Sequence, residues 1–116
     1  MAWQVVFHAD FISEFQSFSI AVQDEILALA TVLEEYGPRL GRPHVDTLRN
    51  SAFNNMKELR LSADDGEWRV AFAFDAVRRA ILLCAGDKSG ISEKRFYKAL
   101  IDKADRRFAA HRKGNR

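Results

Sequence analysis

Hydrophobic and polar residues recur with different periods along the chain, and the changes of period mark the expected elements. An aromatic and β-branched run over residues 3–7 predicts a first strand. From Asp10 onward apolar residues recur every three or four positions, which predicts a helix with Asp10 as its N-cap. The serines around residues 17–19 favour a break into two helices, and Gly37-Pro38 should end the second one.

The following part of the chain predicts a loop and then three strands. Residues 39–55 keep no sustained period and contain many turn-forming residues, so we expect them to be mostly loop. Strands are expected over about residues 56–61, 67–75 and 79–85. Because the connections between them are short, the three strands should form an antiparallel meander.

The middle strand of this meander alternates between large apolar side chains and small or polar ones. One face is therefore expected to pack in the core and the other to be open and polar. The first strand repeats the pattern, with Glu58 and Arg60 on the polar side, and the third is apolar on both sides and is expected to be central. In the middle strand the expected core face carries Trp68, Val70, Phe72 and Phe74, and the expected open face carries Arg69, Ala71, Ala73 and Asp75.

The last expected element is a helix over about residues 92–112, with one apolar stripe and an otherwise basic surface. The predicted fold is α+β, an antiparallel sheet with two N-terminal helices on one face and a C-terminal helix. A chain of 116 residues builds one core, so we expect a single domain over residues 1–116 with a basic tail from about residue 109.

Charge is distributed unevenly along the chain. The net charge is +2, but residues 1–37 contain six acidic residues and no Lys or Arg, so residues 38–116 carry +8. A basic region of this size attracts polyanions such as nucleic acids through their phosphates. A merely solvated basic helix would have the same composition, and composition alone does not separate the two.

Composition argues against several classes of protein and site. The apolar runs are far shorter than the roughly 20 residues that cross a bilayer, and no basic-then-apolar leader is present, so we expect a soluble cytoplasmic protein without membrane association. The lone Cys84 lies in an apolar run and should be a buried structural thiol. Dispersed histidines and the lack of a glycine-rich phosphate loop predict neither metal nor cofactor.

The order of elements and an ordered set of short motifs resemble the HigB-like toxins of the RelE/ParE superfamily, including phage-derived members. The resemblance extends from about residue 3 to residue 112. It implies a microbial-ribonuclease-like fold and the toxin of a type II toxin-antitoxin pair, which inhibits translation by cleaving messenger RNA on the ribosome. It also implies a cognate antitoxin, often a helix-turn-helix protein. The motifs are Lys57-Glu58-Leu59-Arg60, Trp68-Arg69-Val70, Asp75, Asp87-Lys88 and Lys94-Arg95-Phe96-Tyr97-Lys98-Ala99.

The resemblance also implies which residues form the site. The arginines of two neighbouring strands fall on Arg60 and Arg69, and basic positions around the same cleft fall on Lys57 and Lys88. The motifs that carry the resemblance contain no histidine, so the general base is left open. The expected catalytic residues are Arg60, Arg69, Glu58 and Lys88, and the expected RNA-binding residues are Lys57, Lys94, Arg95, Tyr97 and Lys98.

The chemistry of these residue types suits RNA cleavage, but each residue also has an alternative, purely structural role. A guanidinium binds two phosphate oxygens at once, so Arg60 and Arg69 could clamp the scissile phosphate, and alanine at either should abolish toxicity without unfolding the protein. Their alternative is a cross-strand ion-pair cluster with Glu58. Glu58 itself is either a base or, as we favour, the structural partner of these arginines. Tyr97 belongs to the apolar stripe, which favours burial over base stacking.

For Lys94, Arg95 and Lys98 a solvated helix face is as well supported as phosphate contact. Two other functions share the expected fold. A ParE-like inhibitor of DNA gyrase would arrest growth without cleaving RNA, and a non-toxic nucleic-acid-binding module would be harmless when expressed alone.

Overall fold

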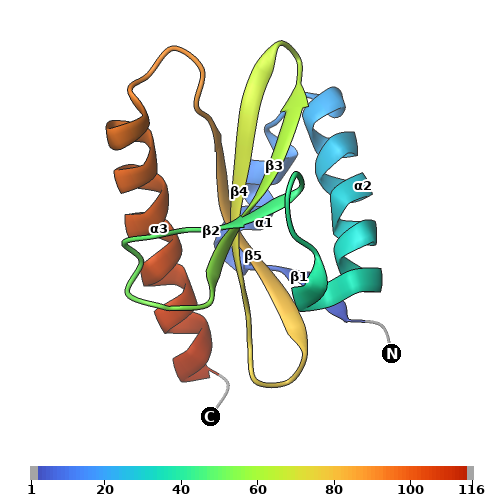
Figure 1. The fold of residues 1–116 in the computed structure, drawn as a ribbon, viewed down its shortest axis with the longest axis vertical. Helices are drawn as coiled ribbons and strands as arrows, with labels where there is room; N and C mark the ends of the chain where they lie inside the picture. Colours follow the sequence, from blue (N-terminus) through green and yellow to red (C-terminus); the bar gives the residue numbers. More distant parts are fainter. Residues whose placement is uncertain (1–2, 115–116) are drawn as a thin grey trace.

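A five-stranded sheet separates the helices into two layers in this computed structural model, which describes residues 3–114 (Figure 1). The expected α+β fold is confirmed. Along the chain the elements are β1 (Gln4–Phe7), α1 (Ala9–Gln16), α2 (Ile20–Tyr36), the 3-10 turn η1 (Gly37–Arg39), β2 (Val45–Thr47), β3 (Met56–Ala63), β4 (Gly66–Phe74), β5 (Arg79–Asp87) and α3 (Glu93–Gly114).

The strand order is β1-β5-β4-β3-β2. The antiparallel meander β3-β4-β5 is confirmed, and its first turn places Asp64 and Asp65 at φ values of 53° and 58°, as a two-residue hairpin loop requires. The sheet as a whole is mixed, because β1 pairs with β5 in parallel. β5, expected to be central, lies inside the sheet between β1 and β4. Residues 45–47, expected to be loop, form β2 at the edge of the sheet beside β3.

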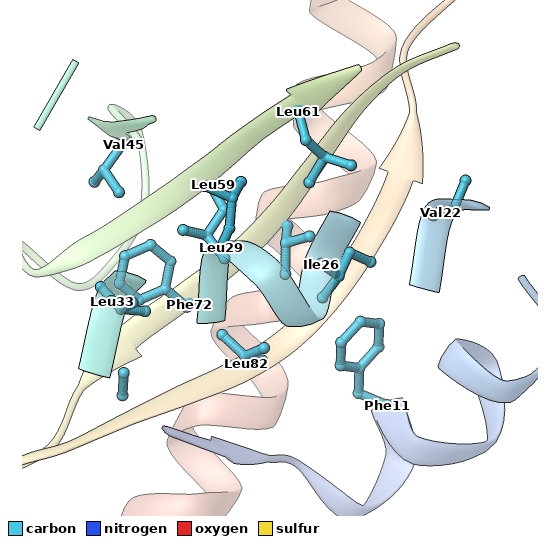
Figure 2. Packing of buried hydrophobic residues seen from close by; sticks show 12 residues of the cluster. Phe11, Val22, Ile26, Leu29, Leu33, Val45, Leu59, Leu61, Phe72 and Leu82 are labelled. Carbon is cyan, nitrogen blue, oxygen red and sulfur yellow. The ribbon is translucent and has the colours of Figure 1, made fainter. Parts of the chain in front are cut away.

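Helices α1 and α2 cover one face of the sheet, as predicted. Phe11 and the buried stripe of α2 pack onto the large apolar side chains of the meander, including Leu59, Phe72 and Leu82 (Figure 2). The backbone at the end of α2 lies against the Trp3 ring. A Cβ atom on Gly37 would be 2.3 Å from that ring, so only glycine fits at this position. This layer contains most of the aromatic side chains of the core.

Helix α3 covers the opposite face, which the strand pattern had predicted to be open and polar. Ala71 and Ala73 of β4 are fully buried there, together with Phe96 and Leu100 of α3. The small alanine side chains leave room for a helix to lie close to the sheet. A strand face without large apolar residues is therefore buried here rather than exposed to solvent. The predicted burial of Cys84 is confirmed in this layer, and burial raises the pKa of its thiol to about 12.

Polar contacts hold α3 to both sides of the molecule. Arg107 binds the Glu14 carboxylate through both of its terminal nitrogens, at 2.9 and 2.6 Å, and also donates to the Leu83 carbonyl at 2.7 Å. That carbonyl lies on β5 just beyond the residues that pair with β1, so Arg107 satisfies an unpaired strand edge. On the other side, Asp105 accepts hydrogen bonds from Ser51 Oγ and the Ala52 N–H.

No helix in the described residues is long and apolar enough to span a membrane.

The N-cap of α1 is His8 rather than the expected Asp10. Its Nδ1 accepts a hydrogen bond from the Asp10 N–H at 3.1 Å, and Asp10 occupies the first turn instead. Only an imidazole without a proton on Nδ1 can accept this bond. Burial is the main cause that lowers the pKa of His8 below its ordinary value of 6.5.

This cap makes stability depend on pH. Because the pKa of His8 is lower in the folded protein than in the unfolded chain, the unfolded state binds the proton first, and the free energy of unfolding should fall as pH drops through 6.5. Urea titrations at several pH values measure this. The His8→Asn variant keeps a good N-cap without a titrating group and should lose that part of the slope. An identical slope in both proteins would contradict the assignment.

Candidate functional site

A groove of about 880 Å³ runs between the residue 42–50 segment and the first three turns of α3, with β3 forming part of its lining. Its charges are mixed but positive in sum. Six cationic side chains line it, namely Arg42, Arg49, Arg60, Lys88, Lys94 and Lys98. Four carboxylates also line it, namely Asp46, Glu58, Glu93 and Asp102. Such a lining favours anions and places acids where they could accept protons.

Glu58 contacts three polar side chains at the groove. It is 5% exposed and lies on the α3 side of β3. Its Oε1 accepts a hydrogen bond from the Tyr97 hydroxyl at 2.8 Å and lies 3.8 Å from Arg69 Nε, while its Oε2 lies 4.0 Å from Arg60 Nε. Two strands and α3 thus converge on one carboxylate.

Arg60 and Arg69 are paired across β3 and β4 but differ in accessibility. The Arg60 side chain is 34% exposed and lines the groove, whereas that of Arg69 is 6% exposed and does not. Arg69 donates to the Trp68 carbonyl at 2.9 Å, and its buried Nε has no hydrogen-bond acceptor within residues 3–114. Arg69 is therefore a buried cation next to Glu58 rather than a residue of the groove wall.

The pKa shifts in this cluster follow from burial. Burial raises the pKa of Glu58 above its usual range, although the Tyr97 hydroxyl and the two arginines act in the opposite direction. The pKa of Tyr97 is raised too, first by burial and then by the neighbouring carboxylate. A carboxylate with a raised pKa accepts protons more readily, and a phenol with a raised pKa is neutral and carries a proton that it can donate.

Lys88 and Glu93 close the end of the groove where β5 leads into α3. Lys88 Nζ lies 2.9 Å from Glu93 Oε1, and this contact is the main cause that lowers the pKa of the exposed Glu93 carboxyl. Farther along α3, Lys98 lies 3.3 Å from Asp102 on the rim. Lys94 lines the same stretch and is exposed.

Six of the nine site residues inferred from the sequence line the groove together. They are Glu58, Arg60, Lys88, Lys94, Tyr97 and Lys98. Arg69 lies buried beside them. Lys57 is on the opposite face of β3, since side chains alternate along a strand and its neighbours Met56 and Glu58 face α3. Arg95 is exposed on α3 but does not line the groove, because it lies on another side of the helix.

The wall formed by residues 42–50 was missed from the sequence. Asp46 lies opposite Glu58 in the β2–β3 register, and Arg42, Thr47 and Arg49 line the groove nearby. Three residues of strand are too few to produce a recognisable alternation.

Asp75, another motif residue, does not line the groove. It accepts hydrogen bonds from the Val77 and Arg79 N–H groups and from Arg79 Nε, and therefore holds the β4–β5 turn.

Comparison with known proteins identifies the family. The sequence profile of the phage-derived Gp49-like proteins matches residues 13–109. The chain belongs to this family. Two relatives of this Gp49-like protein are HigB2 and HigB3 of Mycobacterium tuberculosis, both candidate toxins by name. HigB2 is 48% identical over 74% of this chain and 43% of its own length, and HigB3 is 51% identical over 66% of this chain and 64% of its own length. The matched region thus spans less than two thirds of either relative.

Solved structures give the fold. A mutant of the E. coli toxin RelE in its free state superposes with a TM-score of 0.63 at 14% identity, covering 89% of this chain and 97% of RelE. A chain of the archaeal RelE-RelB complex of Pyrococcus horikoshii superposes with a TM-score of 0.56 at 21% identity, covering 78% of this chain and 99% of that one. The expected RelE-like fold and the resemblance to HigB-like proteins are both confirmed for this Gp49-like protein.

Proposed function

We propose that this chain is the toxin of a type II toxin-antitoxin pair and that it cleaves messenger RNA on the ribosome, in the groove between residues 42–50 and α3. The observation that carries the proposal is the convergence of Arg60, Lys88 and Lys94 on a groove that also contains the Tyr97–Glu58 hydrogen bond. Kinship with proteins named as toxins supports it.

The proposed reaction is attack of a ribose 2′-oxygen on the adjacent phosphorus, with loss of the 5′-oxygen of the next nucleotide. Arg60 binds the phosphate oxygens and stabilises the charge that develops on them. Tyr97 accepts the 2′-hydroxyl proton while passing its own proton to Glu58, so the tyrosine stays neutral. The ammonium group of Lys88 or Lys94 gives a proton to the leaving oxygen.

Expression of the chain alone in a bacterial host, with 5′ ends of messages mapped within minutes, tests the proposal. New ends in codon register within translated regions are expected. Growth arrest with intact messages and early DNA damage would indicate a gyrase-directed protein instead. An absence of arrest would favour a non-toxic module.

Tyr97→Phe tests the proton relay, because it removes only the hydroxyl that contacts Glu58. Cleavage should fall by about 100-fold, the lower end of what acid-base groups contribute. The chain has two tyrosines, and Tyr36→Phe at the exposed end of α2 is the matched control. Equal cleavage by both variants at the same protein level would remove Tyr97 from the mechanism.

A cognate antitoxin follows from the same proposal. RelE of Pyrococcus horikoshii forms a complex with RelB, and we expect an antitoxin here too, of the helix-turn-helix kind. Since residues 38–116 carry +8, an acidic segment in that antitoxin would offset the charge of this chain. Co-purification from a host that expresses both proteins tests the pairing.

A further inference from the structure

Asp46, one of the four carboxylates that line the groove, has no part in the proposed proton transfers. Asp46 lies on β2 directly opposite Glu58, on the α3 side of the sheet, because the preceding Val45 is buried against α2 and Leu59. An acid at this place repels a phosphate, so this part of the wall suits another part of a nucleotide.

The Asp46 carboxylate is held in a fixed orientation. Its Oδ1 accepts from the Thr47 N–H at 2.8 Å, and its Oδ2 accepts from Arg42 Nη2 at 2.9 Å. The Thr47 hydrogen bond is the main cause that lowers its pKa, so the group is ionised at neutral pH. The side chain remains 31% exposed, and each oxygen keeps a second acceptor position. Both oxygens of this groove-lining carboxylate can therefore accept one further hydrogen bond each.

Only one RNA base presents two adjacent donors on its Watson–Crick edge. Guanine offers N1–H and N2–H side by side, whereas adenine, cytosine and uracil each place an acceptor next to their donor. Single-stranded RNA is read on these edges once its bases are unstacked. A carboxylate accepts both guanine hydrogens at once and meets lone-pair repulsion from each of the other bases.

We propose that Asp46 selects guanine next to the scissile phosphate. This inference rests on the proposed function for its RNA substrate. Arg42, whose side chain is 73% exposed, positions the carboxylate and can stack on the base plane. Asp46 is a specificity-determining residue, and the proton transfers belong to Glu58 and Tyr97.

Nucleotide binding tests the selection without requiring cleavage. The chain of residues 1–116 is titrated by NMR with the 3′-monophosphates of guanosine, adenosine, cytidine and uridine. The guanosine nucleotide should bind about tenfold more tightly, at the lower end of what a two-bond base contact supplies. Asp46→Asn should remove the preference while the other nucleotides bind as before. Asp24→Asn, on the exposed surface of α2 and outside the groove, is the matched control and should keep it.

Message mapping separates this inference from the proposed function. Ends produced by the unaltered chain should show guanine beside the cut, and those produced by Asp46→Asn should show it less often. Equal affinity for the four nucleotides, or a guanine preference that survives in Asp46→Asn, overturns the inference even if messages are cut. Guanine-selective binding by a chain that cuts no message refutes the proposed function instead.

Discussion

Arg60→Ala should reduce message cleavage by about 100- to 1000-fold, the effect of removing one donor that stabilises a developing charge. The guanidinium is partly exposed in the groove, and its contact with Glu58 is a loose one of 4.0 Å between Nε and Oε2. The fork is therefore free to close on a phosphate. Cleavage is measured as the rate at which new 5′ ends appear after induction.

Two variants make this result specific. Arg60→Lys keeps the charge but not the planar fork and should retain only part of the activity. Arg95→Ala removes an exposed arginine of α3 that does not line the groove, and it should cut like the unaltered chain. Full cleavage by folded Arg60→Ala would move the phosphate site away from this position.

Arg69→Ala should destabilise the fold by about 3–5 kcal/mol, the usual effect of removing one partner of a buried ion pair. Arg69 and Glu58 are both almost fully buried, with 3.8 Å between Nε and Oε1. Without the guanidinium the Glu58 carboxylate faces a low-dielectric interior with the Tyr97 hydroxyl as its remaining close donor. Urea unfolding of purified protein measures the change in the free energy of unfolding.

The double variant Arg69→Met, Glu58→Gln separates charge from packing. It removes both charges at similar volume and should recover much of the lost stability. Arg60→Ala, by comparison, should change stability by less than about 1 kcal/mol, because its ion pair is partly exposed. A loss below about 1 kcal/mol in Arg69→Ala would mean that the buried pair contributes little. The sequence had predicted that this variant would stay folded, and the burial of Arg69 changes that expectation.

Local patterns in the sequence were sufficient for most of the fold. The hairpin β3–β4, the break between α1 and α2 and the stripe of α3 follow from contacts within a few residues, where period and turn chemistry are legible. Which strands pair, and which face a helix covers, could not be predicted in the same way when the residues involved are far apart in the chain. The parallel pairing of β1 with β5, the edge strand β2 and the placement of α3 over Ala71 and Ala73 depend on residues far apart in the chain.

The site divides along the same line. The resemblance of the sequence motifs to the HigB-like toxins implied that Glu58, Arg60, Lys88, Lys94, Tyr97 and Lys98 belong to one site, and these six residues line one groove. Only the tertiary structure decided that Arg69 is buried, that Lys57 faces the other layer and that Asp46 stands opposite Glu58. The physical reason is that residue type fixes what a side chain can do, whereas burial and cross-strand register fix what it can reach.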